Sequence, residues 1–130
     1  MSDLEKAREF FGQDFYATRA TGIVIEEVGE HFARCSFEIT RNHQNAYGGV
    51  MGGVIFTLAD FALAVIANHI HYPSVASQIS INYLNAPKGK KLIARAECIK
   101  DGRTTSIINI DVMDDTDRHI ARLTGTAFKK

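Results

Sequence analysis

The alternation of apolar and polar residues predicts strands in the first forty positions. Residues 22–28 and 31–39 alternate between the two kinds of side chain, as strands with one buried face do. Gly29-Glu30 separates them and suits a two-residue hairpin turn. Residues 3–11 have the acidic start and following glycine of a short helix. This part of the chain therefore predicts a helix followed by a β-hairpin.

A long apolar run follows, from about Val50 to His69. It is too long for a typical strand, and its alanine and leucine content favours a helix. Because it is apolar on nearly every side, we expect the rest of the protein to enclose it. Two glycines, a threonine and Asp60 interrupt the run, and a carboxylate in the middle of a bilayer is costly. A buried helix therefore fits better than a membrane span.

Alternation returns after this helix and predicts four more strands, at residues 77–83, 92–99, 103–113 and 118–128. Asp101-Gly102 is a strong hairpin signal, and residues 114–117 form a second turn. Strands linked by hairpins imply an antiparallel sheet, which must wrap around the apolar helix. We predict one α+β domain over residues 1–130.

Composition narrows the classes of function. The chain has 130 residues with 15 basic and 15 acidic side chains, so it has no overall attraction to nucleic acid or anionic membranes. Its two cysteines, Cys35 and Cys98, lie in apolar runs and are expected to be reduced thiols. The charged residues near the N-terminus do not resemble a secretory signal, so we expect a cytoplasmic location.

Asp60 is the most informative residue, because it is the only charge between Arg41 and Lys88. A carboxylate on an enclosed helix is costly unless it is paired, hydrogen-bonded or protonated. Asp60 is therefore either a structural residue bonded to backbone or hydroxyl groups, or a general base or nucleophile with a tuned pKa.

Two polar features precede Asp60. Gly52 and Gly53 stand at the start of the helix, where free amide groups polarise a bound carbonyl, although tight packing also explains such a pair. In the loop at 40–48, Asn45 is either a turn residue or an amide donor to a substrate, and His43 is expected to orient the loop.

The stretch HQNAYGGVMGGVIFTLAD at residues 43–60 resembles the hotdog-fold acyl-CoA thioesterases, in particular the phenylacetic-acid-degradation group. The order of elements over about residues 15–128 is similar to a hotdog fold. The resemblance implies that Asp60 is the catalytic carboxylate and that the Gly52 amide and Asn45 hold the thioester carbonyl. It also implies a site at a homodimer interface, with pairs of dimers commonly forming homotetramers.

The chain departs from the family pattern at Met51, where the family usually has histidine. Methionine offers no proton and no strong hydrogen bond. Ser77 is the candidate for the hydroxyl that orients water in many family members.

Helix geometry also favours a shared site. Gly52 and Asp60 are ~12 Å apart along a helix axis, too far for both to reach one carbonyl from the same chain. Two helices related by a two-fold axis would bring them together. A basic rim for the phosphates of coenzyme A is expected from Lys88, Lys90, Lys91 and Arg103, although a solvated turn explains the lysines equally well.

Three functions follow from these observations. The first is hydrolysis of an acyl-CoA to a free acid and coenzyme A, without a cofactor. The second is binding of an acyl-CoA or another acyl ligand without catalysis, for which Met51 is the main support. The third, a hydratase, is disfavoured because its pattern pairs a histidine with the acid. His69 and His71 lack further ligands for a metal site.

Overall fold

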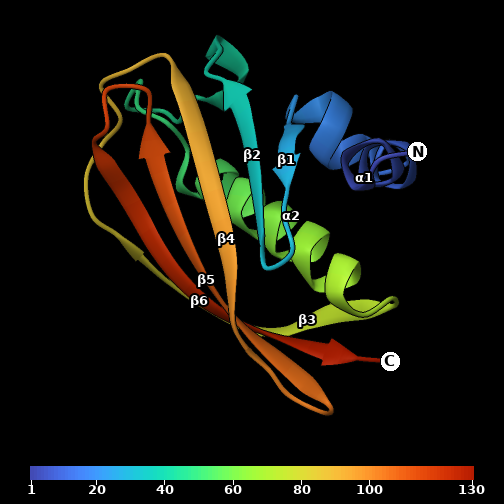
Figure 1. Ribbon diagram of the computed structural model, residues 1–130. Helices are drawn as coiled ribbons and strands as arrows, with labels where there is room; N and C mark the ends of the chain where they lie inside the picture. Colours follow the sequence, from blue (N-terminus) through green and yellow to red (C-terminus); the bar gives the residue numbers. More distant parts are fainter.

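The computed structural model describes residues 1–130 and shows one antiparallel sheet wrapped around a long helix (Figure 1). The sheet has six strands in the order β1-β2-β4-β5-β6-β3, and all neighbours are antiparallel. This is the architecture that the sequence predicted. The helices and strands are α1 (Asp3–Phe11), β1 (Val24–Val28), β2 (Phe32–Glu38), α2 (Gly52–Ile70), β3 (Ser74–Tyr83), β4 (Lys91–Asp101), β5 (Thr105–Asp114) and β6 (His119–Lys129).

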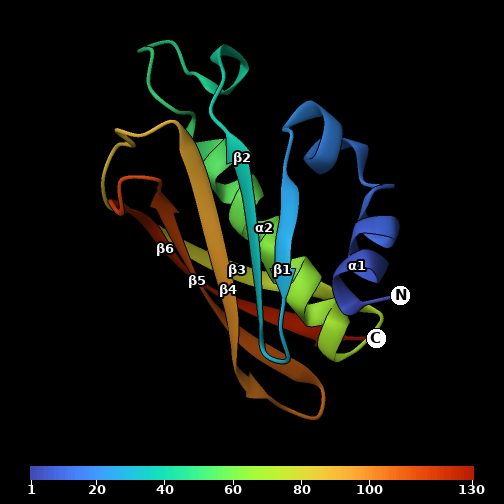
Figure 2. The same ribbon diagram turned by 45° about the horizontal axis from the view of Figure 1, so that its top comes forward.

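Helix α2 packs into the concave side of the sheet (Figure 2). Nine of its 19 residues are buried, which accounts for its apolar character. By length and composition alone α2 is also apolar enough to cross a membrane, as core helices of globular proteins often are. It approaches the sheet closely at Gly125 on β6, where a Cβ atom would overlap Leu63 and lie 3.3 Å from Ile79.

The prediction that α2 is enclosed on nearly every side is wrong for the single chain. One stripe of the helix stays at least partly exposed, at Gly53, Thr57, Asp60, Ala64 and Asn68. These residues recur every three or four positions and so share one face. The sheet of one chain covers only the opposite side of the helix, so this stripe remains available to another surface.

Strand β3 does not pair with β4, its successor in the sequence. It lies at the edge of the sheet opposite β1 and pairs with β6, with Ile81 opposite Leu123. It is therefore an edge strand, and most of its residues are exposed. Ile79 and Ile81 face the core, while Val75 and Tyr83 remain 44% and 53% exposed.

The N-terminal segment covers part of α2. Helix α1 begins with a capping box, in which the Ser2 hydroxyl accepts a hydrogen bond from the Glu5 amide at 3.1 Å. Phe11 packs edge-on against Phe61 of α2, with ring centroids 5.4 Å apart. The following turn of π-helix, Tyr16–Ala20, was not predicted from the sequence.

Candidate active site

The loop before α2 is closed by Asn45. Its side-chain oxygen accepts hydrogen bonds from the amides of Tyr47 at 2.9 Å and Gly49 at 3.1 Å. The Asn45 backbone amide also donates to the Gly49 carbonyl at 2.7 Å. These bonds leave the side-chain NH₂ of Asn45 without a partner. Asn45 is therefore a turn residue, and it still presents a donor to a ligand.

The first turn of α2 presents two free amide groups. The N-cap, Met51, makes no side-chain capping bond, and the amides of Gly52 and Gly53 make no hydrogen bond. At the N-terminus of a 19-residue helix these groups carry partial positive charge. The Tyr83 hydroxyl donates to the Gly52 carbonyl at 3.0 Å, which fixes this turn against β3. The sequence did not identify Tyr83 as part of the site.

Asp60 lies on the exposed stripe of α2, and its carboxylate has no hydrogen bond or ion pair. Burial raises the pKa of this carboxyl, and the negative charge of Asp14 raises it further. Asp14, just before the π-helical turn, is a second residue that the sequence did not single out. Asp60 therefore makes no structural hydrogen bond within the chain, and its carboxylate is available for chemistry.

Gly52 and Asp60 lie two turns apart on the same helix. Their separation of ~12 Å along the axis prevents one chain from placing both against one reacting carbonyl.

His43 has no free ring nitrogen to offer a substrate. It is 6% exposed, its Nδ1 accepts from the Thr40 amide at 2.9 Å, and its Nε2 lies 2.8 Å from the Thr21 carbonyl. These bonds join the loop to the segment before β1. They agree with the expected loop-orienting role and argue against direct contact with the substrate.

Ser77 lies on β3 at the register shift between Ala76 and Gln78, where it has no paired residue on β6. Its hydroxyl donates to the Thr126 carbonyl at 3.2 Å. No hydrogen bond joins it to Asp60 within one chain, so its predicted role as a water-orienting residue stays a prediction.

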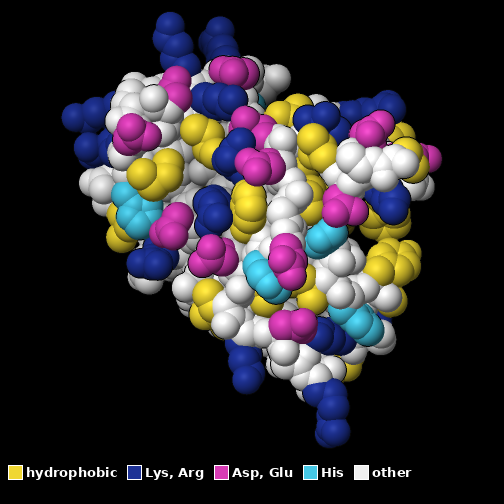
Figure 3. All heavy atoms as spheres, viewed as in Figure 1, with side chains coloured by type: hydrophobic (Ala, Val, Ile, Leu, Met, Phe, Trp, Pro, Cys, Tyr) yellow, Lys and Arg dark blue, Asp and Glu magenta, His cyan; other side chains and the backbone are white.

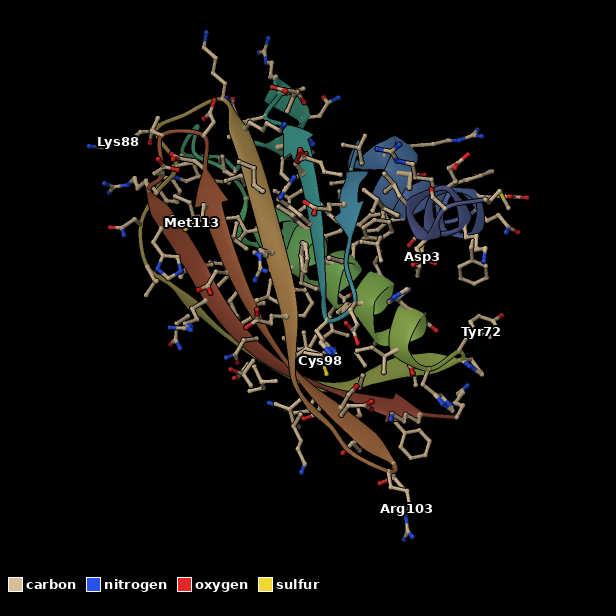
Figure 4. The ribbon with its side chains drawn as sticks, in the orientation of Figure 1. Asp3, Tyr72, Lys88, Cys98, Arg103 and Met113 are labelled. Atoms are coloured by element: carbon tan, nitrogen blue, oxygen red, sulfur yellow. The ribbon has the colours of Figure 1, made fainter.

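The four predicted cations do not form one rim (Figure 4). Lys88 and Lys90 are exposed in the loop between β3 and β4. Lys91 turns to the outer face of the sheet, where its ammonium is 3.6 Å from Glu26. Arg103 lies in the β4–β5 hairpin, at the opposite end of the molecule from Lys88. Within one chain, Lys88 and Lys90 are therefore the two of these cations that are exposed in the same loop.

A hollow of about 430 Å³ lies between the start of α2 and the segment that follows β3. Gly52 and Asn45 line one side, and Tyr83 to Pro87 line the other. The lining ends at Pro87, one residue before the exposed Lys88.

Asp114, at the end of β5, is a buried acid that the sequence assigned only to a turn. Burial opposes its ionisation, but hydrogen bonds from Thr116 and from the amides of Lys88, Gly89 and Arg118 outweigh this and hold the pKa of its carboxyl well below the usual range. Asp114 is therefore a fixed negative charge beneath the lysine loop.

The outer face of the sheet has no single dominant charge. In Figure 3, cations and anions are interspersed over this face. Opposite charges pair across it, as between Arg34 and Glu27 at 2.8 Å. No group of three or more His, Cys, Asp or Glu residues is placed to hold a metal ion.

Comparison with known proteins points to one family. The model of the thioesterase superfamily matches residues 47–121. A putative esterase from Archaeoglobus fulgidus is 32% identical over 106 residues, covering 81% of this chain and 69% of that protein. The acyl-coenzyme A thioesterase PaaI of Escherichia coli is 29% identical over 112 residues, covering 85% and 80%.

Solved structures agree with the fold. The structure of the E. coli PaaI protein matches with a TM-score of 0.90 over 98% of this chain and 94% of that one, at 24% identity, which confirms the hotdog fold. A hypothetical thioesterase protein from Streptococcus pneumoniae, crystallised with coenzyme A, matches with a TM-score of 0.85 at 27% identity, covering 95% and 96%.

Proposed function

This chain belongs to the thioesterase superfamily, and on that premise we propose that it hydrolyses acyl-coenzyme A. Water adds to the thioester carbonyl, the carbon–sulfur bond breaks, and the products are a free acid and coenzyme A. The E. coli relative, an acyl-coenzyme A thioesterase, supports this substrate class. The S. pneumoniae structure with coenzyme A supports recognition of the same carrier.

The observation that carries this proposal is the unpartnered carboxylate of Asp60. As a general base, it takes a proton from water while the water oxygen attacks the carbonyl carbon, and that proton passes to the departing thiolate of coenzyme A as the carbon–sulfur bond breaks. As a nucleophile, it attacks that carbon itself and expels the thiolate, and water then hydrolyses the resulting mixed anhydride, supplying the proton of the thiol and regenerating Asp60. Either role requires the ionised form and an open lone pair. The raised pKa of Asp60 makes its carboxylate a stronger base than an exposed aspartate.

The start of α2 supplies the complementary group. The Gly52 amide points its hydrogen away from the helix and stabilises the negative charge that develops on the carbonyl oxygen. The free NH₂ of Asn45 is a second donor to that oxygen. Gly53 keeps the approach to the backbone open, since it has no side chain.

We propose that the functional site forms in a homodimer, with Gly52 and Asn45 of one subunit facing Asp60 of the partner subunit. The ~12 Å between Gly52 and Asp60 in one chain supports this, as do the exposed stripe of α2 and the edge strand β3. A pair of such dimers, a homotetramer, is the larger assembly proposed. Analytical ultracentrifugation tests both: a sedimenting monomer at micromolar concentration contradicts them.

Coenzyme A is proposed to enter along the hollow between Gly52 and Pro87. The thioester end lies at the α2 amides, and the phosphates reach Lys88 and Lys90. No contact with the substrate in the same subunit is proposed for His43, Lys91 or Arg103, whose side chains are bonded to the chain itself or lie at the other end of the molecule.

A second function, binding of an acyl-CoA without turnover, is favoured by Met51. The side chain at this position is 51% exposed and makes no capping hydrogen bond. It therefore gives the Asn45 loop less support than a histidine would.

A thiol-release assay over a panel of acyl-CoAs of different chain length and aromaticity decides between the two. Release of coenzyme A that is lost in Asp60→Asn and retained in Glu9→Gln, which removes an exposed carboxylate of α1, supports the hydrolase. Binding of an acyl-CoA without thiol release supports the binder. The cytoplasmic location stays a prediction, which cell fractionation tests.

A further inference from the structure

The loop that carries Lys88 is held from below by one buried carboxylate. Asp114 is 1% exposed and accepts five hydrogen bonds. Its Oδ1 accepts from the amide and hydroxyl of Thr116 at 2.9 and 2.6 Å and from the Arg118 amide at 3.0 Å. Its Oδ2 accepts from the amides of Lys88 at 2.8 Å and Gly89 at 2.9 Å. One side chain thus joins the β5–β6 turn to the β3–β4 loop.

Neighbours of Asp114 strengthen the same connection. Asp115 Oδ1 accepts from the Lys90 amide at 2.8 Å. The Arg118 guanidinium donates to the Ala86 carbonyl at 2.9 Å. The backbone of the loop is therefore held at four residues before β4 begins: Ala86, Lys88, Gly89 and Lys90.

These bonds fix the backbone from which the side chains of Lys88 and Lys90 project. The amides of Lys88, Gly89 and Lys90 donate to the β5–β6 turn, and the side chains of the two lysines are exposed. Figure 4 shows Lys88 projecting outward at the end of the sheet where Met113, the neighbour of Asp114, also lies. The loop continues directly from the hollow that begins at Gly52.

We propose that Asp114 is a positioning residue for coenzyme A recognition, which holds Lys88 and Lys90 beside the hollow that leads to Gly52. This inference rests on the proposed function. A preformed loop binds phosphates without the entropy loss of ordering a flexible one. Asp114 lies away from the thioester end of the hollow, so its effect falls on substrate binding and not on the chemical step.

The substitution Asp114→Asn tests this role with little change of shape. The amide oxygen can satisfy the three donors of the β5–β6 turn, and the amide NH₂ then faces the N–H groups of Lys88 and Gly89. The loop is released while the turn is kept. We expect the KM for acyl-CoA to rise about 10-fold and kcat to stay within about 2-fold.

An acyl-pantetheine substrate is the matched control, because it keeps the thioester and lacks the nucleotide phosphates. Its kcat/KM is expected to be the same for wild type and Asp114→Asn. On a Lys88→Ala/Lys90→Ala background, adding Asp114→Asn is expected to change the KM for acyl-CoA by less than about 2-fold, since the lysines it positions are gone.

Gly89→Ala disturbs the loop without changing Asp114, and it is the alternative test of the positioning role if Asp114→Asn does not fold. A Cβ on Gly89 would overlap the Asp115 carboxylate, so the loop must shift. The same rise in KM for acyl-CoA, with unchanged use of acyl-pantetheine, is expected.

The outcomes separate this inference from the proposed function. Equal losses on acyl-CoA and acyl-pantetheine, or an undiminished effect on the lysine-free background, overturn the positioning role while hydrolysis stands. If the wild type hydrolyses neither substrate, the hydrolase proposal fails, and calorimetric titration with coenzyme A decides the positioning role. Weaker binding by Asp114→Asn then supports it, whereas equal binding, or no binding by the wild type, overturns it.

Discussion

Replacing Asp60 by asparagine is expected to remove most of the activity and leave the folded protein at least as stable. The Asp60 carboxylate has no partner, and burial together with the charge of Asp14 raises its pKa. An acid whose pKa is raised on folding destabilises the folded state once it is ionised, so at neutral pH this charge opposes folding. Asparagine has nearly the same shape and no charge, so it removes that opposition without leaving a cavity.

The effect on catalysis follows from the chemistry of the group. An amide cannot take the proton of a water molecule or attack a thioester, so turnover is expected to fall at least ~100-fold, the usual scale for a positioned general base. This corresponds to about 2.7 kcal/mol of activation free energy.

Two measurements on Asp60→Asn check the argument, at the same pH and protein concentration as the wild type. Initial rates of thiol release at saturating acyl-CoA give the turnover, and calorimetric melting gives Tm. Near-normal turnover refutes the catalytic assignment. A Tm lowered by more than about 4 °C, equivalent to about 1 kcal/mol in a domain of this size, refutes the account of an unpartnered carboxylate.

Four other predictions follow from the site and its supports. Asp14→Asn lowers the pKa of Asp60, so the acid limb of the kcat/KM profile moves to lower pH; an unchanged or higher limb contradicts this. Mixing Asp60→Asn with Asn45→Ala subunits restores part of the activity after subunit exchange; no recovery despite mixing proven by mass spectrometry places the site within one chain. Met51→His preserves or raises turnover in the thiol-release assay, since it adds a donor beside the Asn45 loop; an active wild type that loses turnover on this change opposes that account. Because the pKa of Asp114 is lowered by folding, its ionised carboxylate stabilises the folded state at pH values above ~3.9, the pKa of an aspartate in the unfolded chain. This stabilisation is lost as the pH falls below that value, so the difference in Tm between wild type and Asp114→Asn narrows below about pH 4. A difference that stays constant down to about pH 3 disproves this.

Periodicity predicted the elements of this fold because each strand has one buried face and α2 is strongly apolar. It could not predict that β3 pairs with β6, since a strand's pattern specifies its buried face and not its neighbour. The exposed stripe of α2 was missed for a similar reason. Ala64 and Thr57 are compatible with a buried or an exposed position, and only the sheet's coverage decides.

The candidate site likewise contains residues that could be identified from the sequence and residues that could not. Asp60 was identified from the sequence because a lone charge in an apolar helix conflicts with burial. The roles of Asp14 and Tyr83 depend on contacts between segments far apart in the chain, which no local pattern encodes. The separation of Arg103 from Lys88 within one chain could not be predicted, because a basic residue in a turn gives no information about which end of the sheet that turn occupies.

The place of β6 between β5 and β3 has a consequence for the order of events during translation. Strand β3 is complete at Tyr83, but its only partner in the sheet is His119–Lys129. At a synthesis rate of roughly 5–20 residues per second, β3 waits about 2–9 s for that partner. During this interval the apolar α2 also lacks the part of its cover that β5 and β6 provide. Codons that slow translation between residues 84 and 118 would therefore lengthen the exposure of this apolar surface in the nascent chain.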